Sequence, residues 1–187
     1  MPRQVFLFDP PERFVAGTVG QPGSRTFFLQ ARTGPRTTSV ALEKSQVELL
    51  AERVEELLDE VLRLSGGAAP VPAVAPAALE DLDPLEAPVV EEFRVGALAL
   101  GWDGEDDRVV IEAHAPAEDE EVPDVGEDVD EGADVLRVRL SAAAARAFCK
   151  RALAVVSAGR PPCPFCSQPL DPEGHICPRA NGYRRRD

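Results

Sequence analysis

Aromatic residues, cysteine, histidine and long apolar runs are all scarce in this 187-residue chain. Aromatic residues make up only 5% of it, so Val, Leu and Ala must supply most of a hydrophobic core. No apolar run approaches the roughly 20 residues that span a bilayer, and the apolar stretch near the N-terminus is too short for a secretory signal. We therefore expect a soluble cytoplasmic protein with no membrane partner, whose four cysteines are reduced.

Familiar catalytic motifs are also missing. The sequence contains no GxSxG, no P-loop, no GxGxxG and no HExxH pair. An enzymatic reading therefore rests on isolated acids such as Asp9, Glu12 and Asp103. The run Asp9-Pro10-Pro11-Glu12 is more typical of a turn than of an active-site loop. We predict no catalytic residue from the sequence.

Negative charge is abundant but unevenly placed. The net charge is −13, yet residues 66–134 alone carry 21 acidic and two basic residues. Residues 135–158 carry five basic residues and no acidic one. Contact with the phosphates of a duplex needs clustered basic residues on the protein surface. This distribution of charge therefore disfavours duplex nucleic acid as a partner of the whole chain.

Residues 1–67 predict a β-meander followed by a helix. Runs rich in Val, Phe, Leu and Thr at 4–8, 13–19, 26–31 and 36–42 are separated by short turns, which favour antiparallel neighbours. Ser45 and Glu48 match a capping box, and apolar residues then recur at helical spacing. The helix is expected to end at Ser65-Gly66-Gly67.

Residues 91–158 repeat this plan within the same globular body. Runs at 93–100 and 108–115 predict strands, and 135–140 alternates Val or Leu with Arg, as a half-buried strand does. Ser141 then caps a second helix, Ala142–Ser157. The predicted fold class is α+β: antiparallel strands with two helices on one face, in two strands-then-helix halves of negligible sequence identity.

Two segments of biased composition interrupt these elements. Residues 68–90 contain five prolines among Ala and acidic residues, which predicts a flexible linker. Ten of the 18 residues in 117–134 are acidic, and such repulsion predicts a disordered loop. Calcium binding and mimicry of nucleic acid are the functional alternatives for this loop, although its spacing does not fit an EF-hand.

Residues 159–187 form a tail that contains the candidate metal ligands. Cys163, Cys166, His175 and Cys177 lie within 15 positions, and Cys-x-x-Cys lets two thiolates converge from a tight turn. The run from Cys163 resembles the knuckle of zinc ribbons and rubredoxins, with Ser167 where that pattern usually has Gly. Four protein ligands would fill a tetrahedron, so we predict a structural zinc site rather than a catalytic one.

Cys149 is the rival of His175 as fourth ligand. It lies on the second predicted helix among apolar residues at core spacing, where a cysteine behaves as a small hydrophobe. A redox role for Cys163 and Cys166 is not favoured, because no βαβ pattern precedes them. His114, alone on a predicted strand, is interpreted as an ordinary surface or edge residue.

Three stretches of the sequence resemble an uncharacterised actinobacterial family classed as a domain of unknown function. They are residues 3–14, the Gly-Arg-Pro-Pro-Cys-Pro run at 159–164, and 174–183, which reads Gly-His-Ile-Cys-Pro-Arg-Ala-Asn-Gly-Tyr. The resemblance covers the chain apart from the Ala/Pro linker and the acidic loop. It implies a soluble cytoplasmic bacterial protein and carries over no catalytic, cofactor-binding or partner-binding residue.

The leading functional hypothesis is a non-catalytic binding or adaptor protein. Beyond the metal ligands, Arg179, Asn181 and Tyr183 form a candidate surface for an unknown protein or an anionic small ligand. An Arg fork beside an aromatic ring suits phosphate, carboxylate or a stacked base.

Two alternatives remain open at the level of sequence. One is an enzyme acting on a phosphorylated or acidic small substrate, which requires Arg13, Arg137 and Arg139 to converge on a cleft. The other is local nucleic-acid binding by the basic tail, through the three arginines at 184–186.

Overall fold

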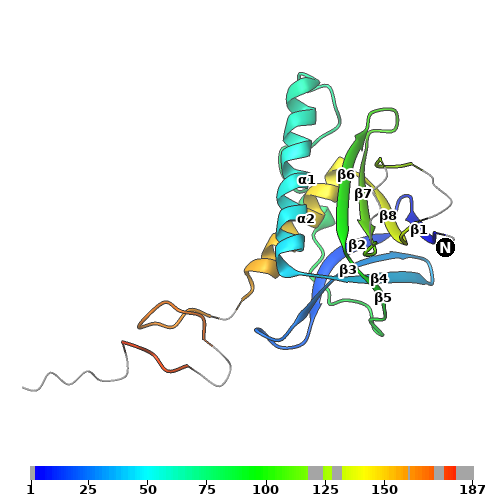
Figure 1. Ribbon diagram of the computed structural model, residues 1–187. Helices are drawn as coiled ribbons and strands as arrows, with labels where there is room; N and C mark the ends of the chain where they lie inside the picture. Colours follow the sequence, from blue (N-terminus) through cyan, green and yellow to red (C-terminus); the bar gives the residue numbers. More distant parts are fainter. Residues whose placement is uncertain (1–2, 118–123, 128–131, 160, 171–174, 180–187) are drawn as a thin grey trace, which may run out of the picture.

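In the computed structural model, two four-stranded β-sheets and two α-helices share one hydrophobic core, which confirms the α+β class. The structure describes residues 3–117, 124–127, 132–159, 161–170 and 175–179. The strands are β1 (Val5–Phe8), β2 (Arg13–Val19), β3 (Thr26–Thr33), β4 (Arg36–Leu42), β5 (Glu91–Arg94), β6 (Ala97–Asp103), β7 (Arg108–His114) and β8 (Val135–Ser141). The helices are α1 (Lys44–Leu64), the short 3-10 helix η1 (Ala77–Leu79) and α2 (Ala142–Ser157). Figure 1 shows α1 and α2 packed together beside the strands.

Each sheet is an antiparallel meander completed by one strand from the other half of the chain. The first sheet has the order β2-β3-β4-β5 and the second has β1-β8-β7-β6. β1 pairs in parallel with β8, and β5 pairs in parallel with β4. The prediction that all four strands of residues 1–67 form one meander was therefore wrong for β1. The pairing of β1 with β8 joins residues 130 positions apart, and such a distant pairing leaves no local pattern in the sequence.

The predicted strand over 93–100 is two strands, because the chain changes sheets within it. The N–H of Val95 donates to the carbonyl of Ala41 in the first sheet, and the N–H of Gly96 donates to the carbonyl of His114 in the second. A Cβ on Gly96 would lie 2.7 Å from the Cα of Pro116. Only glycine fits this crossing without displacing the neighbouring backbone.

Helix α1 is amphipathic and buries one stripe of its surface. Val47, Leu50, Ala51, Val54 and Leu58 are buried at the spacing of a helical face, and each Val or Leu side chain among them contributes about 1.5–3 kcal/mol when fully removed from water. None of the described helices is both long and apolar enough to cross a membrane.

The helix caps match the sequence prediction in one case and not in the other. The capping box of α1 uses Glu43 and Gln46 instead of Ser45 and Glu48, so that prediction was wrong by two residues. The helix begins earlier because β4 runs into it with no intervening loop. The Ser141 hydroxyl accepts from the N–H of Ala144 at 3.2 Å, as predicted for α2.

The core lies between the helices and the inner faces of both sheets. Phe14 of β2 stacks on Phe148 of α2 with ring centroids 4.7 Å apart. Leu29 and Val40 of the first sheet and Ile111 of the second belong to the same buried cluster. The two halves therefore share one core.

Segments 68–90 and 124–127 pack on the body. Asp81 bonds to Arg13 and Arg151, and Val71 joins the main core. Of the acidic stretch 117–134 that was predicted to be disordered, residues 117, 124–127 and 132–134 are described, and 124–127 lie on the second sheet. Residues 118–123 and 128–131 lie outside the described residues. The division into domains and the flexibility of 68–90 stay predictions, although 68–90 makes specific contacts.

Candidate metal centre

The first half of the metal cluster is a short turn closed by backbone hydrogen bonds. Pro162 and Pro169 face each other in an antiparallel bridge, and the N–H of Cys163 donates to the carbonyl of Gln168 at 2.8 Å. The N–H of Ser167 donates back to the carbonyl of Cys163 at 2.8 Å. This closes a turn that carries Cys163 and Cys166 on the same side.

Ser167 adopts a left-handed backbone conformation with φ of 61°. This is the position where the zinc-ribbon pattern usually has Gly, and positive φ is the physical reason for that preference. The sequence departs from the pattern here, but the backbone keeps the conformation of the turn.

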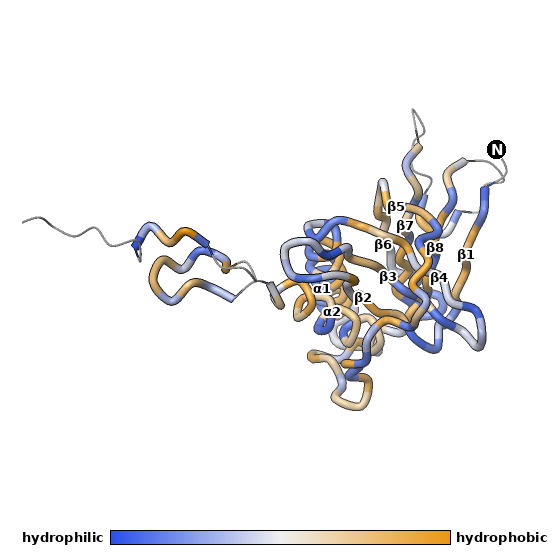
Figure 2. The backbone as a smooth tube through the Cα atoms, turned by 90° about the horizontal axis from the view of Figure 1, so that it is seen from below, coloured by the Kyte–Doolittle hydropathy of each residue, from blue (hydrophilic) through white to orange (hydrophobic). Residues whose placement is uncertain are grey.

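The four predicted ligands come together. The ligand atoms of Cys163, Cys166, His175 and Cys177 all lie within 4.8 Å of one another, an arrangement that could hold a metal ion. The sulfurs of Cys163 and Cys177 are 3.8 Å apart, and His175 Nε2 lies 3.2 Å from the sulfur of Cys166. Figure 2 shows the described parts of the tail set to one side of the body.

The pKa values of two thiols in this cluster, Cys163 and Cys166, are shifted in opposite directions. Burial raises the pKa of Cys163, but backbone N–H groups of Phe165 and Cys166 bond its sulfur and bring the net pKa below its ordinary value. The N–H of Gln168 lowers the pKa of Cys166, but burial and the neighbouring thiols Cys163 and Cys177 outweigh it and raise the pKa. Loss of the thiol proton is therefore favoured at Cys163 and disfavoured at Cys166 relative to an ordinary cysteine, and a bound divalent cation would favour it at both.

The donor set and its spacing fit zinc. A tetrahedral ion with Zn–S bonds of about 2.3 Å places two thiolates roughly 3.8 Å apart, which matches Cys163 and Cys177. The same distance is far longer than the roughly 2.05 Å of a disulfide, and all four cysteines are free. Nδ1 of His175 is buried without a hydrogen-bond partner among the described residues.

Cys149 lies outside this cluster. It is fully buried on α2 within the main core, and burial, reinforced by Glu55, raises the pKa of its thiol far above the ordinary range. Among the described residues, the group that gathers around Cys163 includes His175 and not Cys149. This placement agrees with its interpretation as a small hydrophobe.

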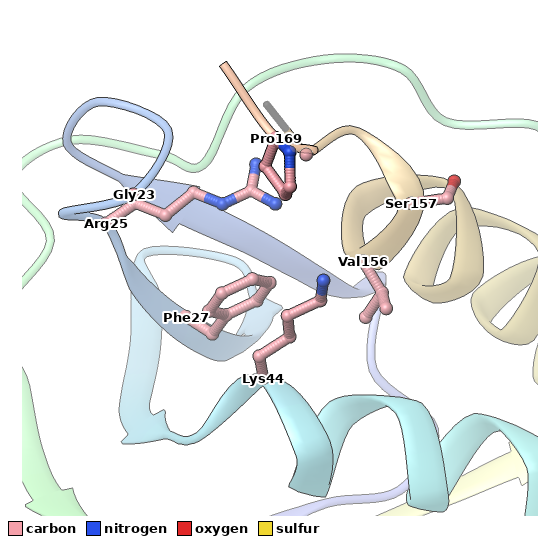
Figure 3. A pocket seen from close by; sticks show the side chains of 8 residues that line it. Gly23, Arg25, Phe27, Lys44, Val156, Ser157 and Pro169 are labelled. Atoms are coloured by element: carbon pink, nitrogen blue, oxygen red, sulfur yellow. The ribbon is translucent and has the colours of Figure 1, made fainter. Parts of the chain in front are cut away.

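The tail leaves the body beside a cleft with two cationic side chains. Arg25 donates to the carbonyls of Val155 and Ala158 at the C-terminal end of α2, and its guanidinium lies over the ring of Phe27. Lys44, at the start of α1, points into the same cleft of about 470 Å³ (Figure 3). Arg25 thus stabilises the helix end from which the tail departs.

Of the predicted partner-binding residues, only Arg179 is described. It is exposed, and its Nη1 lies 3.4 Å from the carbonyl oxygen of Phe165. Asn181, Tyr183 and the three arginines at 184–186 lie outside the described residues.

The three arginines required by the enzymatic alternative do not converge. Arg13 pairs with Asp81, Arg137 with Glu112, and Arg139 with Asp9, Asp103 and Asp106. Glu12, the remaining candidate acid, pairs with Arg32. Each guanidinium is neutralised by its own carboxylates, so these residues do not form a common substrate-binding cleft.

A buried trio of polar side chains on the second sheet was not among the residues predicted from the sequence. Glu112 is buried between Arg137, 2.5 Å away, and Nε2 of His114, 3.1 Å away. His114 is 3% exposed, so its interpretation as a surface or edge residue was wrong. Glu112 and His114 alternate along one predicted strand, and Arg137 and Arg139 alternate along another. Once β7 and β8 pair, Glu112 stands directly opposite Arg137, and this charge complementarity was the signal that the sequence offered.

The chain belongs to the family described as "Protein of unknown function (DUF3090)", which matches residues 6–177. The match extends to Cys177 and so includes all four residues of the metal cluster. No curated protein and no solved structure matches the chain.

Proposed function

We propose that this is a non-catalytic binding or adaptor protein whose tail folds around a structural zinc ion and presents Arg179, with Asn181 and Tyr183, to a protein partner. The observation that carries the proposal is the convergence of three thiols and one imidazole within 4.8 Å. Four protein ligands satisfy a tetrahedral zinc ion and leave no position for a substrate or an activated water.

The surface next to the metal ligands supports a binding role. Phe165, between the two cysteines of the turn, is 61% exposed, and Ile176, between His175 and Cys177, is 83% exposed. Arg179 contacts the carbonyl of Phe165, which brings a cation beside this aromatic residue. Aromatic and Arg side chains are enriched at protein interfaces.

Cobalt substitution tests the closed coordination directly. Cobalt-loaded protein is expected to show the absorption bands of a tetrahedral thiolate site, unchanged when cyanide or phosphate is added. A catalytic site with an open position would change its spectrum with either anion, and that result would contradict the proposal. Cys149→Ala is the matched control and is expected to give the same spectrum as the wild type.

Partner capture tests the adaptor role. Wild-type protein, Arg179→Glu and Cys163→Ser are immobilised in parallel, and proteins retained by the wild type are quantified by mass spectrometry. A specific partner is expected to be retained by the wild type and lost by both variants. Equal retention by Cys163→Ser would contradict a metal-dependent binding surface.

A further inference from the structure

The cleft at the base of the tail joins several parts of the fold. Arg25 and Phe27 line it from the start of β3, and Lys44 lines it from the start of α1. Val156, near the end of α2, and Pro169, in the metal-binding turn, complete the lining that Figure 3 shows. We call the space between these five residues the tail-base cleft. Its volume of about 470 Å³ lies within the range of small-molecule sites, roughly 300–1,000 Å³.

The tail-base cleft is basic although the chain is acidic. The sequence has 33 acidic and 20 basic residues, yet the described residues that line the cleft include Arg25 and Lys44 and no carboxylate. Glu43, the acidic neighbour of Lys44, is directed elsewhere, because its carboxylate pairs with Arg94 at 2.7 Å and caps the N–H of Gln46. The described lining therefore offers positive charge to a ligand.

The two helix ends beside the cleft do not cancel this charge. The C-terminal end of α2 is the negative end of its dipole, and it faces Arg25, which donates to the carbonyls of Val155 at 3.2 Å and Ala158 at 2.9 Å. Lys44 lies in the first turn of α1, where the helix dipole is positive. Each helix end is equivalent to about half a unit charge, and the two are of opposite sign, so the full charges of the two side chains remain.

The two cations have different roles. The Nη atoms of Arg25 are occupied by the carbonyls of α2, and its guanidinium carbon lies 4.8 Å from the centre of the Phe27 ring. Its fork is therefore committed to the fold. Lys44 is exposed and directs its ammonium group into the cleft (Figure 3). Lys44 is thus the group that can pair with the head group of a ligand.

A single ammonium group favours a head group with one negative charge. Phosphate sites typically combine bidentate Arg forks with further N–H donors, and the fork of Arg25 is already used. A carboxylate needs less, because one charge-assisted hydrogen bond from an ammonium group satisfies much of its charge. The head group that fits Lys44 best is therefore a carboxylate.

The remaining lining residues favour an apolar body on the ligand. The rings of Phe27 and Pro169 and the side chain of Val156 present carbon atoms to the cleft. Removing an apolar ligand surface from water against such a lining is favourable. Small-molecule sites commonly combine an apolar lining with a few polar groups that fix the orientation of the ligand.

We propose that the tail-base cleft binds a small organic carboxylate with an aromatic or aliphatic body. The carboxylate pairs with the ammonium group of Lys44, and the body lies against Phe27, Val156 and Pro169. Because Pro169 belongs to the tail, the ligand contacts the tail and the body of the protein together. This site lies apart from the surface around Arg179 and takes a small molecule instead of a protein.

Fluorescence titration of the purified full-length protein with naphthalene carboxylate tests the site. Naphthalene carboxamide has the same rings without the charge and is expected to bind about tenfold more weakly, because it loses the charge-assisted hydrogen bond to Lys44. Absence of carboxylate binding, or equal affinity for the two probes, would overturn the proposal. Tighter binding of naphthyl phosphate would overturn the assignment of the head group as a carboxylate.

Substitution of Lys44 tests its role in the same assay. Lys44→Gln is expected to weaken binding of naphthalene carboxylate by about tenfold, whereas Lys44→Arg keeps the charge and most of the affinity. Lys150→Gln is the matched control, because Lys150 pairs with Glu80 outside the cleft, and it is expected to bind as the wild type does. Wild-type affinity in Lys44→Gln would contradict the proposal.

Amide chemical shifts locate the bound probe. Naphthalene carboxylate is expected to shift the amide signals of Lys44 and of Gly159, which also lines the cleft, and to leave that of Gly104 in the β6–β7 turn unchanged. The spectrum of Lys44→Gln without the probe also shows whether this variant keeps the fold. Shifts that bypass Lys44 and Gly159 would place the probe elsewhere and overturn the proposal.

Discussion

Ser167 is the residue on which the shape of the metal-binding turn depends most directly. It holds a left-handed φ of 61° that places its N–H on the carbonyl of Cys163. Left-handed backbone costs an L-residue about 1–2 kcal/mol, and a β-branched side chain makes it still less favourable.

Substitution at Ser167 is therefore expected to change zinc affinity according to backbone preference. Ser167→Val should weaken zinc binding by about tenfold, equivalent to ~1.4 kcal/mol, while Ser167→Gly should match or exceed the wild type. Competition with a chromophoric chelator measures both constants. Val and Gly variants of equal affinity would show that the turn does not require this conformation.

Glu112 is the second residue to consider, because the ionisation of its buried carboxyl group affects the stability of the fold. Burial raises its pKa, but bonds from His114, the Gly126 N–H and Arg137 outweigh this and hold the pKa at about 2, below its ordinary 4.5. Because the folded-state pKa lies below the ordinary value, the ionised carboxylate stabilises the fold above pH 4.5. That contribution is lost as the pH falls from 4.5 towards 2.

Glu112→Gln is expected to destabilise the protein by about 3 kcal/mol at pH 7, because it removes the buried carboxylate that pairs with the charge of Arg137. Urea unfolding at pH 7, 4.5 and 3 should also show a smaller loss of stability with acid in this variant than in the wild type. Glu105→Gln, in an exposed turn, is the control and should behave as the wild type. An unchanged pH dependence in Glu112→Gln would contradict this role.

At the scale of elements, local patterns predicted much of what the structure contains. Both helices and most strands lie where apolar periodicity and turn residues place them, because those signals are contained within a few residues. The ligand cluster was also predictable, since Cys-x-x-Cys and His-x-Cys each bring two donors together by local geometry. The burial of His114 was not, because it depends on β7 lying between β6 and β8 and on the segment that covers them.

The metal-binding tail is expected to behave as a local unit. Its described hydrogen bonds, such as those from Cys163 to Gln168 and from Leu170 to Pro161, stay within the tail. Removing zinc with a chelator should therefore raise amide hydrogen exchange in residues 161–177 and change the Tm of the body by less than about 2 °C. A large fall in body Tm would show that the metal stabilises the whole fold.

At the scale of the whole molecule, the two halves exchange their first strands. β1 completes the sheet of the second half and β5 completes the sheet of the first. Phe8 at the end of β1 is 1% exposed and belongs to the shared core. Sequence patterns suggested the repeat of strands then helix but not this exchange, because parallel pairing across the chain depends on contacts with no local signature.

Strand exchange predicts that neither half folds alone. A fragment of residues 1–67 lacks β5 and half of the core, and a fragment of residues 68–187 lacks β1. Each is expected to show no cooperative urea transition by circular dichroism, whereas co-expression should yield a folded one-to-one complex. Cooperative unfolding of either isolated fragment would contradict the mutual dependence of the halves.

The metal content of the purified protein tests the central claim most directly. Elemental analysis is expected to find close to one zinc per chain in the wild type and in Cys149→Ala, and close to none in Cys163→Ser. Absence of metal from the wild type, or its retention by Cys163→Ser, would contradict a zinc centre formed by Cys163, Cys166, His175 and Cys177.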